Sequence, residues 1–126
     1  MTGKQLYEQA VVLLGMETEQ VVYLEPLVLG CINQMLNDRL YEQNALQRAQ
    51  GGDVQHMLAT APALESLEDE VPYEEMFVRE CFPYGLAALL VAEDDRTMFN
   101  WLMSEYERRA AYYAPCTLTD MQEMEE

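Results

Sequence analysis

The sequence is short of basic residues. Its 126 residues include 23 Asp and Glu but only 7 Lys and Arg, which gives a formal net charge of −16. Nonspecific binding to nucleic acid requires basic side chains that displace phosphate counterions, so this composition argues against a freestanding DNA-binding protein. Anionic membrane surfaces are disfavoured for the same reason.

Long apolar runs are also missing. No segment approaches the roughly 20 apolar residues that cross a bilayer. The N-terminal stretch MTGKQLYEQAVVLLGM carries charge and glutamine where a secretory signal would be uniformly apolar. The composition therefore predicts a soluble, cytosolic protein, and the length predicts a single domain.

The cysteines are few and scattered. Cys31, Cys81 and Cys116 are widely spaced and form no Cys-x-x-Cys pair, so neither a zinc site nor redox exchange is indicated. We expect Cys31 and Cys81 to be core residues, because both lie on apolar helical faces, and Cys116, which follows Pro115, to be exposed.

Catalytic groups are equally scarce. The only histidine, His56, follows Asp53 by three residues and belongs to no Glu-x-x-His or His-x-x-x-His pattern, so a helical di-metal site lacks its ligands. Lys4 and His56 are the only candidate bases for a nucleophile, and neither has a convincing partner. Gly51-Gly52 has no downstream lysine and is not a phosphate loop. An enzyme is the least favoured class, and we expect no cofactor or metal.

Apolar residues at helical spacing are present in four segments. The first helix is predicted from about Gly3 to Leu14, because Thr2 and Gln5 have the form of a capping box and Gly15 stands at a C-terminal cap.

The second helical segment continues to about residue 50. Pro26 marks either the start of a new helix or a kink, and we favour a start near Glu25 after a turn at residues 20–24. The predicted apolar face consists of Leu24, Val28, Cys31 and Met35, with Arg39 at its end and Leu27, Ile32 and Leu36 beside it.

The third and fourth helices form a hairpin. Val71-Pro72 is predicted to start the third helix, and Pro83 to bend it. Asp94-Asp95 is predicted to form the turn and to cap the fourth helix. The apolar stripe of this last helix is Met98, Phe99, Leu102, Met103, Tyr106, Ala110 and Tyr113.

The sequence thus predicts an all-α fold, a compact bundle of about four helices with a kinked C-terminal hairpin. The single domain spans residues 1–115 and includes an irregular, acidic connection at residues 51–72. Residues 116–126 are acidic and aperiodic, so we expect a flexible tail, ordered only when it docks.

Several features are candidates for an interaction surface. The acidic cluster that includes Glu68, Asp69 and Glu70 is either a solvated loop or a docking strip for a basic partner. Nine methionines and eight tyrosines accompany it, and adaptable protein interfaces are rich in both residue types. Trp101 lies off the main stripe of its helix, so it is either a second core face or an interface anchor.

The segment from Ala63 to Ala111 resembles the small helical head-to-tail connector (adaptor, or head-completion) proteins of long-tailed bacteriophages and prophages. The shared order is an acidic leucine-rich loop, a proline-led helix, a Gly-Leu-Ala-Ala segment, an acidic turn, and a helix ending in Tyr-Glu and basic residues. In this chain these features are Leu64–Glu70, Pro72–Phe82, Gly85–Ala88, Asp94-Asp95, and Tyr106-Glu107 with Arg108-Arg109. Leu13–Gly15 and Ile32-Asn33 add a weaker match.

The resemblance implies a non-enzymatic virion protein at the head–tail junction, assembled in the cytoplasm of the bacterial host. Such connectors form a ring, commonly of twelve copies, beneath the portal protein. They extend the DNA channel without specific DNA binding and carry a stopper or tail-completion protein, and their C-terminal segments commonly reach the portal.

A closed ring requires two different, complementary patches on each subunit. Arg79, Arg96, Arg108 and Arg109 are candidates to pair with the acidic strip of a neighbouring subunit. The alternative is an acidic helical inhibitor or DNA mimic that binds a basic protein and needs only an acidic face. The arginines of the C-terminal hairpin favour the ring.

Overall fold

A computed structural model describes residues 1–51 and 58–113, apart from the side chain of Thr18. The elements are α1 (Gly3–Leu13), a 3₁₀ helix η1 (Thr18–Leu24), α2 (Glu25–Asp38), α3 (Leu40–Ala49), α4 (Glu75–Val91) and α5 (Arg96–Tyr112). The predicted all-α fold is confirmed: helices dominate, and the described residues contain no β-strand.

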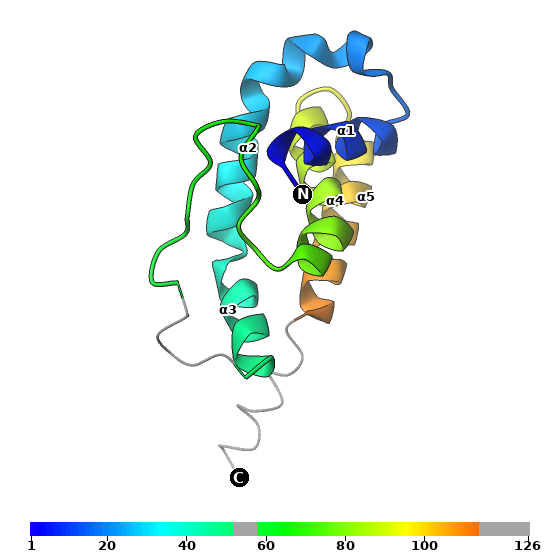
Figure 1. Ribbon diagram of the computed structural model, residues 1–126. Helices are drawn as coiled ribbons and strands as arrows, with labels where there is room; N and C mark the ends of the chain where they lie inside the picture. Colours follow the sequence, from blue (N-terminus) through cyan, green and yellow to red (C-terminus); the bar gives the residue numbers. More distant parts are fainter. Residues whose placement is uncertain (52–57, 114–126) are drawn as a thin grey trace.

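Helix α4 is the centre of the fold. It packs against α1, α2 and α5 (Figure 1), and most of its residues are buried, including Phe77, Phe82 and Leu86. The rings of Phe77 and Phe82 meet edge to face at 5.4 Å, a favourable geometry for aromatic pairs. One hydrophobic core joins this helix to the buried faces of α1, α2 and α5.

Close packing explains the Gly-Leu-Ala-Ala segment of α4. A Cβ atom on Gly85 would lie 2.8 Å from Sδ of Met35 and 2.8 Å from the ring of Tyr106. Glycine at this position therefore lets α2 and α5 approach α4 closely. The helix continues through Pro83, and the bend expected there stays a prediction.

The ends of α1 confirm the sequence prediction. The Thr2 hydroxyl accepts from the Gln5 amide and the Gln5 side chain accepts from the Thr2 amide, which completes the capping box. After the helix, Gly15 has a φ of 69°, a left-handed conformation that glycine adopts without steric cost.

The second helical segment starts at Glu25, as predicted, but it is two helices rather than one. Helix α2 ends at Asp38, and Arg39 adopts φ −111° and ψ 14° before α3 begins. The Arg39 side chain is buried and pairs with Glu42 and Glu107. These contacts hold the chain at the break, which apolar periodicity alone does not reveal. Leu27, expected beside the apolar face, is 58% exposed.

The start of α4 also differs from the prediction. The helix begins at Glu75 rather than at Val71-Pro72, and the Glu74 carboxylate caps it by accepting from the amides of Met76 and Phe77. The amide of Val71 donates to the Met1 carbonyl instead, and the Tyr73 hydroxyl donates to the carbonyl of Leu36. These tertiary bonds keep residues 71–73 out of the helix. Met76, in the first turn of the helix, is 52% exposed.

The predicted hairpin turn is confirmed. Asp95 caps α5, because its Oδ1 accepts from the Met98 amide at 3.0 Å. Leu102, Tyr106 and Ala110 of the predicted stripe are buried, and Met98, Phe99, Met103 and Tyr113 pack partly buried against the core.

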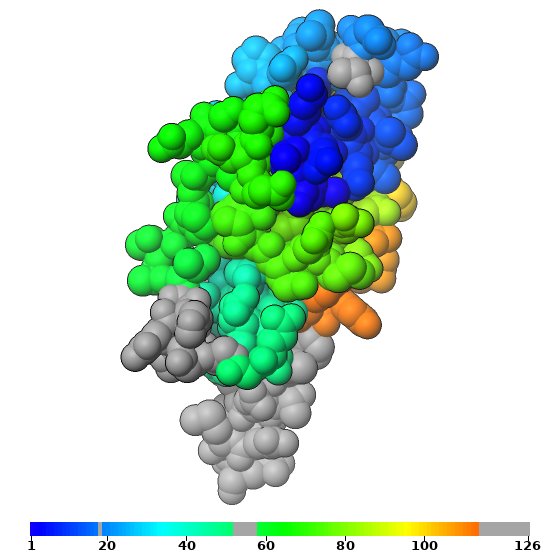
Figure 2. Space-filling model, viewed as in Figure 1, coloured from blue at the N-terminus to red at the C-terminus, as the bar shows by residue number. Residues whose placement is uncertain are grey.

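Residues 58–74, which we name the strap, connect α3 to α4 without a helix of their own. The Asn33 side chain brackets the backbone of Leu64, donating to its carbonyl at 3.1 Å and accepting from its amide at 2.7 Å. Asn44 brackets Leu58 in the same way. The strap also pairs with the start of α1, and the two lie side by side in Figure 2. Residues 52–57 of the predicted connection and the tail from residue 114 lie outside the described residues.

Candidate functional site

A groove runs between α1, α4 and α5. Its central cavity has a volume of about 360 Å³ and shares lining residues with two smaller neighbouring hollows. We name it the arginine groove and define it by Val12, Arg79, Glu80, Tyr84, Arg108, Arg109 and Tyr112. It brings together three of the arginines that the sequence singled out.

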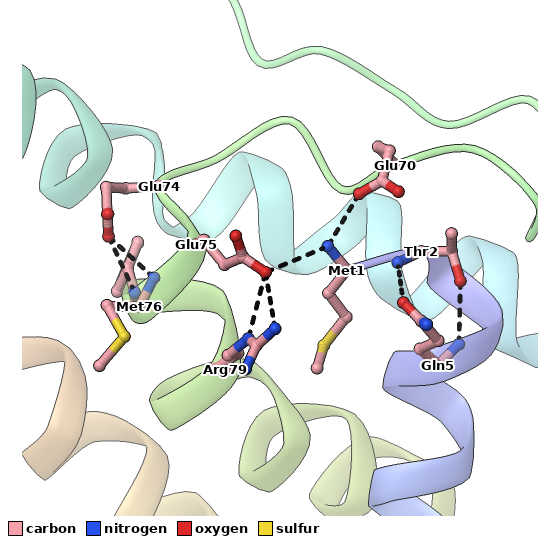
Figure 3. A network of polar contacts seen from close by, with 9 residues as sticks. Met1, Thr2, Gln5, Glu70, Glu74, Glu75, Met76 and Arg79 are labelled. Atoms are coloured by element: carbon pink, nitrogen blue, oxygen red, sulfur yellow. Dashed lines mark hydrogen bonds and ion pairs between the residues drawn. The ribbon is translucent and has the colours of Figure 1, made fainter.

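Arg79 lies where the groove meets the start of α4. Its guanidinium donates to Oε1 of Glu75 at 2.9 and 3.2 Å (Figure 3). The same carboxylate lies 3.9 Å from the Met1 ammonium group, which also contacts Glu70 at 2.8 Å. The Arg79 side chain remains 58% exposed, so part of its guanidinium faces solvent.

Arg109 stacks on an aromatic ring. Its Cζ lies 4.1 Å from the centroid of the Tyr84 ring, and its Nη1 donates to the Glu80 carbonyl at 3.2 Å. The centroid of the Trp101 ring lies 6.4 Å from the centroid of the Tyr84 ring. Trp101 is 54% exposed, which favours its interpretation as a surface anchor over a second core face.

Glu105 holds two arginines in place. Its carboxylate accepts from Arg108 at 2.7 Å and from Arg109 at 3.3 Å. The hydrogen bond from Arg108 lowers the pKa of the Glu105 carboxyl below its ordinary value, and it raises the pKa of Arg108. The Glu105 carboxylate therefore orients both guanidinium groups near the end of α5.

Arg96 does not join the groove. It is exposed in the first turn of α5, 12 residues before Arg108, which corresponds to about 18 Å along the helix. The structure thus separates Arg96 from the other three candidate arginines.

The acidic candidates lie on the strap. Asp69 accepts from the amides of Glu65 and Ser66 at 3.0 Å, so its carboxylate stabilises a local turn. Glu70 contacts the Met1 ammonium group. The side chains of Glu65 and Glu68 are exposed, which leaves these two carboxylates available to a partner.

Sequence reasoning missed the groove as a unit. It did not select Val12, which is 74% exposed, nor Tyr84 and Tyr112, because their proximity depends on how α1 packs against the hairpin. The four-residue spacings Glu75–Arg79 and Glu105–Arg109 were the available signal, since such pairs meet on one helix face.

Within residues 1–51 and 58–113, no group of three or more His, Cys, Asp or Glu side chains could hold a metal ion. Cys81 is a buried core residue, as predicted, and burial raises the pKa of its thiol to about 12, whereas Cys31 is only half-buried. His56, Asp53 and Cys116 lie outside the described residues. None of the described helices is long and apolar enough to span a membrane.

Comparison of the chain with protein-family models, with curated proteins and with solved structures finds no match.

Proposed function

We propose that the protein is the subunit of a head-to-tail connector of a long-tailed bacteriophage or prophage. Copies of the chain form a ring beneath the portal protein, extend the DNA channel, and carry a stopper or tail-completion protein. The role is structural, and the protein acts at the head–tail junction of the virion after assembly in the host cytoplasm. The observation that carries the proposal is the arginine groove on a chain with a net charge of −16.

The groove supports a ring because a head-to-tail contact needs two unlike patches on one subunit. One patch is the groove with its arginines on α4 and α5. The other is the exposed carboxylates of Glu65 and Glu68 on the strap, which packs on α1 and α2. Figure 1 shows the strap beside α2 and α5 beyond α4. The two patches therefore lie on different elements of the subunit.

The overall charge suits a channel that DNA must cross. A negative wall repels phosphate, so DNA passes without being held by nonspecific ion pairs. An acidic inhibitor or DNA mimic would have the same negative charge, but it would not need three arginines grouped at one groove. The grouping therefore favours the connector.

Charge reversal tests the proposal. We expect Arg108→Glu with Arg109→Glu to abolish assembly, measured as molar mass by light scattering coupled to size exclusion, while circular dichroism shows unchanged helicity. Glu65→Arg with Glu68→Arg should restore assembly in the same chain, because the contact is then rebuilt with opposite signs. Arg96→Glu is the matched control, since it makes the same change on α5 outside the groove. Assembly of the double arginine variant at the native level would refute the proposed contact.

A further inference from the structure

The arginine groove opens where the described part of the chain ends. Tyr112 and Tyr113 line this end of it. The Tyr113 ring lies 5.3 Å from that of Phe77, and its hydroxyl donates to the Met76 carbonyl at 3.4 Å. Residue 113 is thus held at the edge of the groove, and residues 114–126 continue from that point.

The composition of residues 114–126 complements the groove. The segment, APCTLTDMQEMEE, carries four carboxylate side chains and no basic residue, and it also holds Leu118, Met121 and Met124. The groove offers three arginines and the exposed side chain of Val12; Glu80 lines it, and Glu75 and Glu105 pair with the arginines while leaving Arg79 and Arg108 more than half exposed. The carboxylates of residues 114–126 therefore complement the arginines of the groove. The flexible apolar side chains of the same segment complement the apolar surface of the groove.

The arginines have bonding capacity left for such a segment. A guanidinium carries five N–H donors, and Arg79 and Arg108 each use theirs on a single carboxylate of the same helix. Their side chains are 58% and 66% exposed. Further carboxylates can thus bind without breaking the existing pairs.

Residues 114–126 are also long enough to extend along the groove. Along α4 the groove extends from Arg79 to Tyr84, five residues that correspond to about 8 Å of helix. Thirteen extended residues reach up to about 45 Å, so the chain can turn back after Tyr113 and cover this length. Attachment at residue 113 gives a local concentration of order millimolar, which favours the segment over the same segment of a separate copy.

We propose that residues 116–126 bind in the arginine groove of their own chain, with their carboxylates on Arg79, Arg108 and Arg109. The bound segment then competes with a neighbouring subunit for the groove and holds back ring assembly until it is displaced. Binding of the segment does not depend on the proposed function, whereas the effect on assembly rests on it.

Disulfide trapping in the full chain tests the binding. In a background of Cys31→Ala and Cys116→Ser, Met121→Cys is combined with Val12→Cys in the groove, and mild oxidation is followed by gel and mass spectrometry. We expect an intramolecular disulfide in most chains. Pairing Met121→Cys with Tyr41→Cys, an exposed position on α3, should give at least fivefold less.

Charge variants show whether the Val12–Met121 disulfide forms because the segment binds the arginines or because the segment meets the groove at random. Neutralising the segment with Asp120→Asn, Glu123→Gln, Glu125→Gln and Glu126→Gln should reduce the Val12–Met121 disulfide at least fivefold without touching any described contact. Arg108→Glu with Arg109→Glu should do the same, and Arg96→Glu should have no effect. Equal yields in native and neutralised chains, or a disulfide that joins two chains, would overturn the proposal.

The effect on assembly is measured separately. We expect the neutralised chain to reach the ring mass at a protein concentration at least threefold lower than the native chain. If the Val12–Met121 disulfide forms but neither chain assembles, the connector proposal fails while the segment–groove contact stands. If both chains assemble at the same concentration, the competition is refuted.

Discussion

The guanidinium of Arg39 lies over the ring of Tyr106, with Cζ 4.2 Å from the ring centroid. The contact joins the break between α2 and α3 to the buried face of α5, and the same side chain pairs with Glu42 at 3.1 Å and with Glu107. Arg39 is 7% exposed. A buried cation is thus held by two carboxylates and one aromatic face.

Removal of Arg39 should destabilise the fold strongly. Arg39→Ala leaves the mostly buried Glu42 carboxylate without its partner and empties space beside Tyr106, so we expect a loss of about 3 kcal/mol in the free energy of unfolding. Arg39→Lys should recover only part of this loss, since an ammonium group lacks the planar stacking surface. Urea unfolding followed by circular dichroism measures both. Arg96→Ala, at an exposed site, should change stability by less than about 0.5 kcal/mol, and an equal loss there would contradict the account.

Two helix glycines should respond in opposite directions to alanine. Gly85→Ala places a Cβ 2.8 Å from the Met35 sulfur and from the Tyr106 ring, so overpacking should cost about 1–3 kcal/mol. Gly30 in α2 has no neighbouring atom within 4 Å of such a Cβ. Gly30→Ala should therefore stabilise the protein by about 0.5–1 kcal/mol through helix propensity. Denaturant unfolding of the Gly85→Ala and Gly30→Ala variants measures both changes in stability. Stabilisation by Gly85→Ala would contradict the close packing of Gly85 against Met35 and Tyr106.

The strap should loosen when its asparagine bracket is removed. Asn33→Ala deletes both hydrogen bonds to the Leu64 backbone, and we expect a loss of about 1–3 kcal/mol together with faster amide exchange at Leu64. Hydrogen exchange read by mass spectrometry on strap peptides provides the measurement. Gln34→Ala, at the exposed neighbouring position, is the control. Unchanged strap exchange in Asn33→Ala would show that the bracket does not hold the strap.

Stability should fall at alkaline pH. Burial, with a further contribution from the charge of Glu42, raises the pKa of Tyr73 to about 12, whereas an unfolded tyrosine titrates near about 10. Above about pH 10 the unfolded chain loses a proton that the folded chain keeps, so the stability contribution of Tyr73 is present below that pH and is lost as the pH rises towards 12.

Tyr73→Phe isolates this effect. The variant loses the hydrogen bond to the Leu36 carbonyl, so it should be less stable at neutral pH by about 1 kcal/mol. Between pH 9 and pH 11 its melting temperature should decline less steeply than that of the native chain. If the melting temperatures of the two proteins decline equally over this pH range, Tyr73 is not buried as described.

Local chemistry in the sequence was sufficient to predict several helix ends. The capping box at Thr2, the start at Glu25 and the cap at Asp95 each depend on residues within one turn. The break at Arg39 and the late start of α4 depend on partners far along the chain, such as Glu107 for Arg39 and Met1 for Val71. Tertiary hydrogen bonds and ion pairs override local preference at these two places.

The contacts of the arginine groove also divide into those that local spacing predicts and those that depend on tertiary packing. The ion pair between Glu75 and Arg79 could be read from its spacing on one helix. The stacking of Arg109 on Tyr84 could not, because it depends on the packing of α5 against α4. The contribution of Val12 to the groove could not be predicted either, because it also depends on the position of α1.

The central claim is that subunits assemble through the arginine groove. Its most direct test is the molar mass of the native chain and of the chain with neutralised residues 116–126, by light scattering coupled to size exclusion over a range of concentration. The account predicts that both rise from the 14.5 kDa subunit to a single ring-sized species, the neutralised chain at lower concentration, and that Arg108→Glu with Arg109→Glu prevents the rise. A mass of one subunit for both chains at every concentration would contradict it.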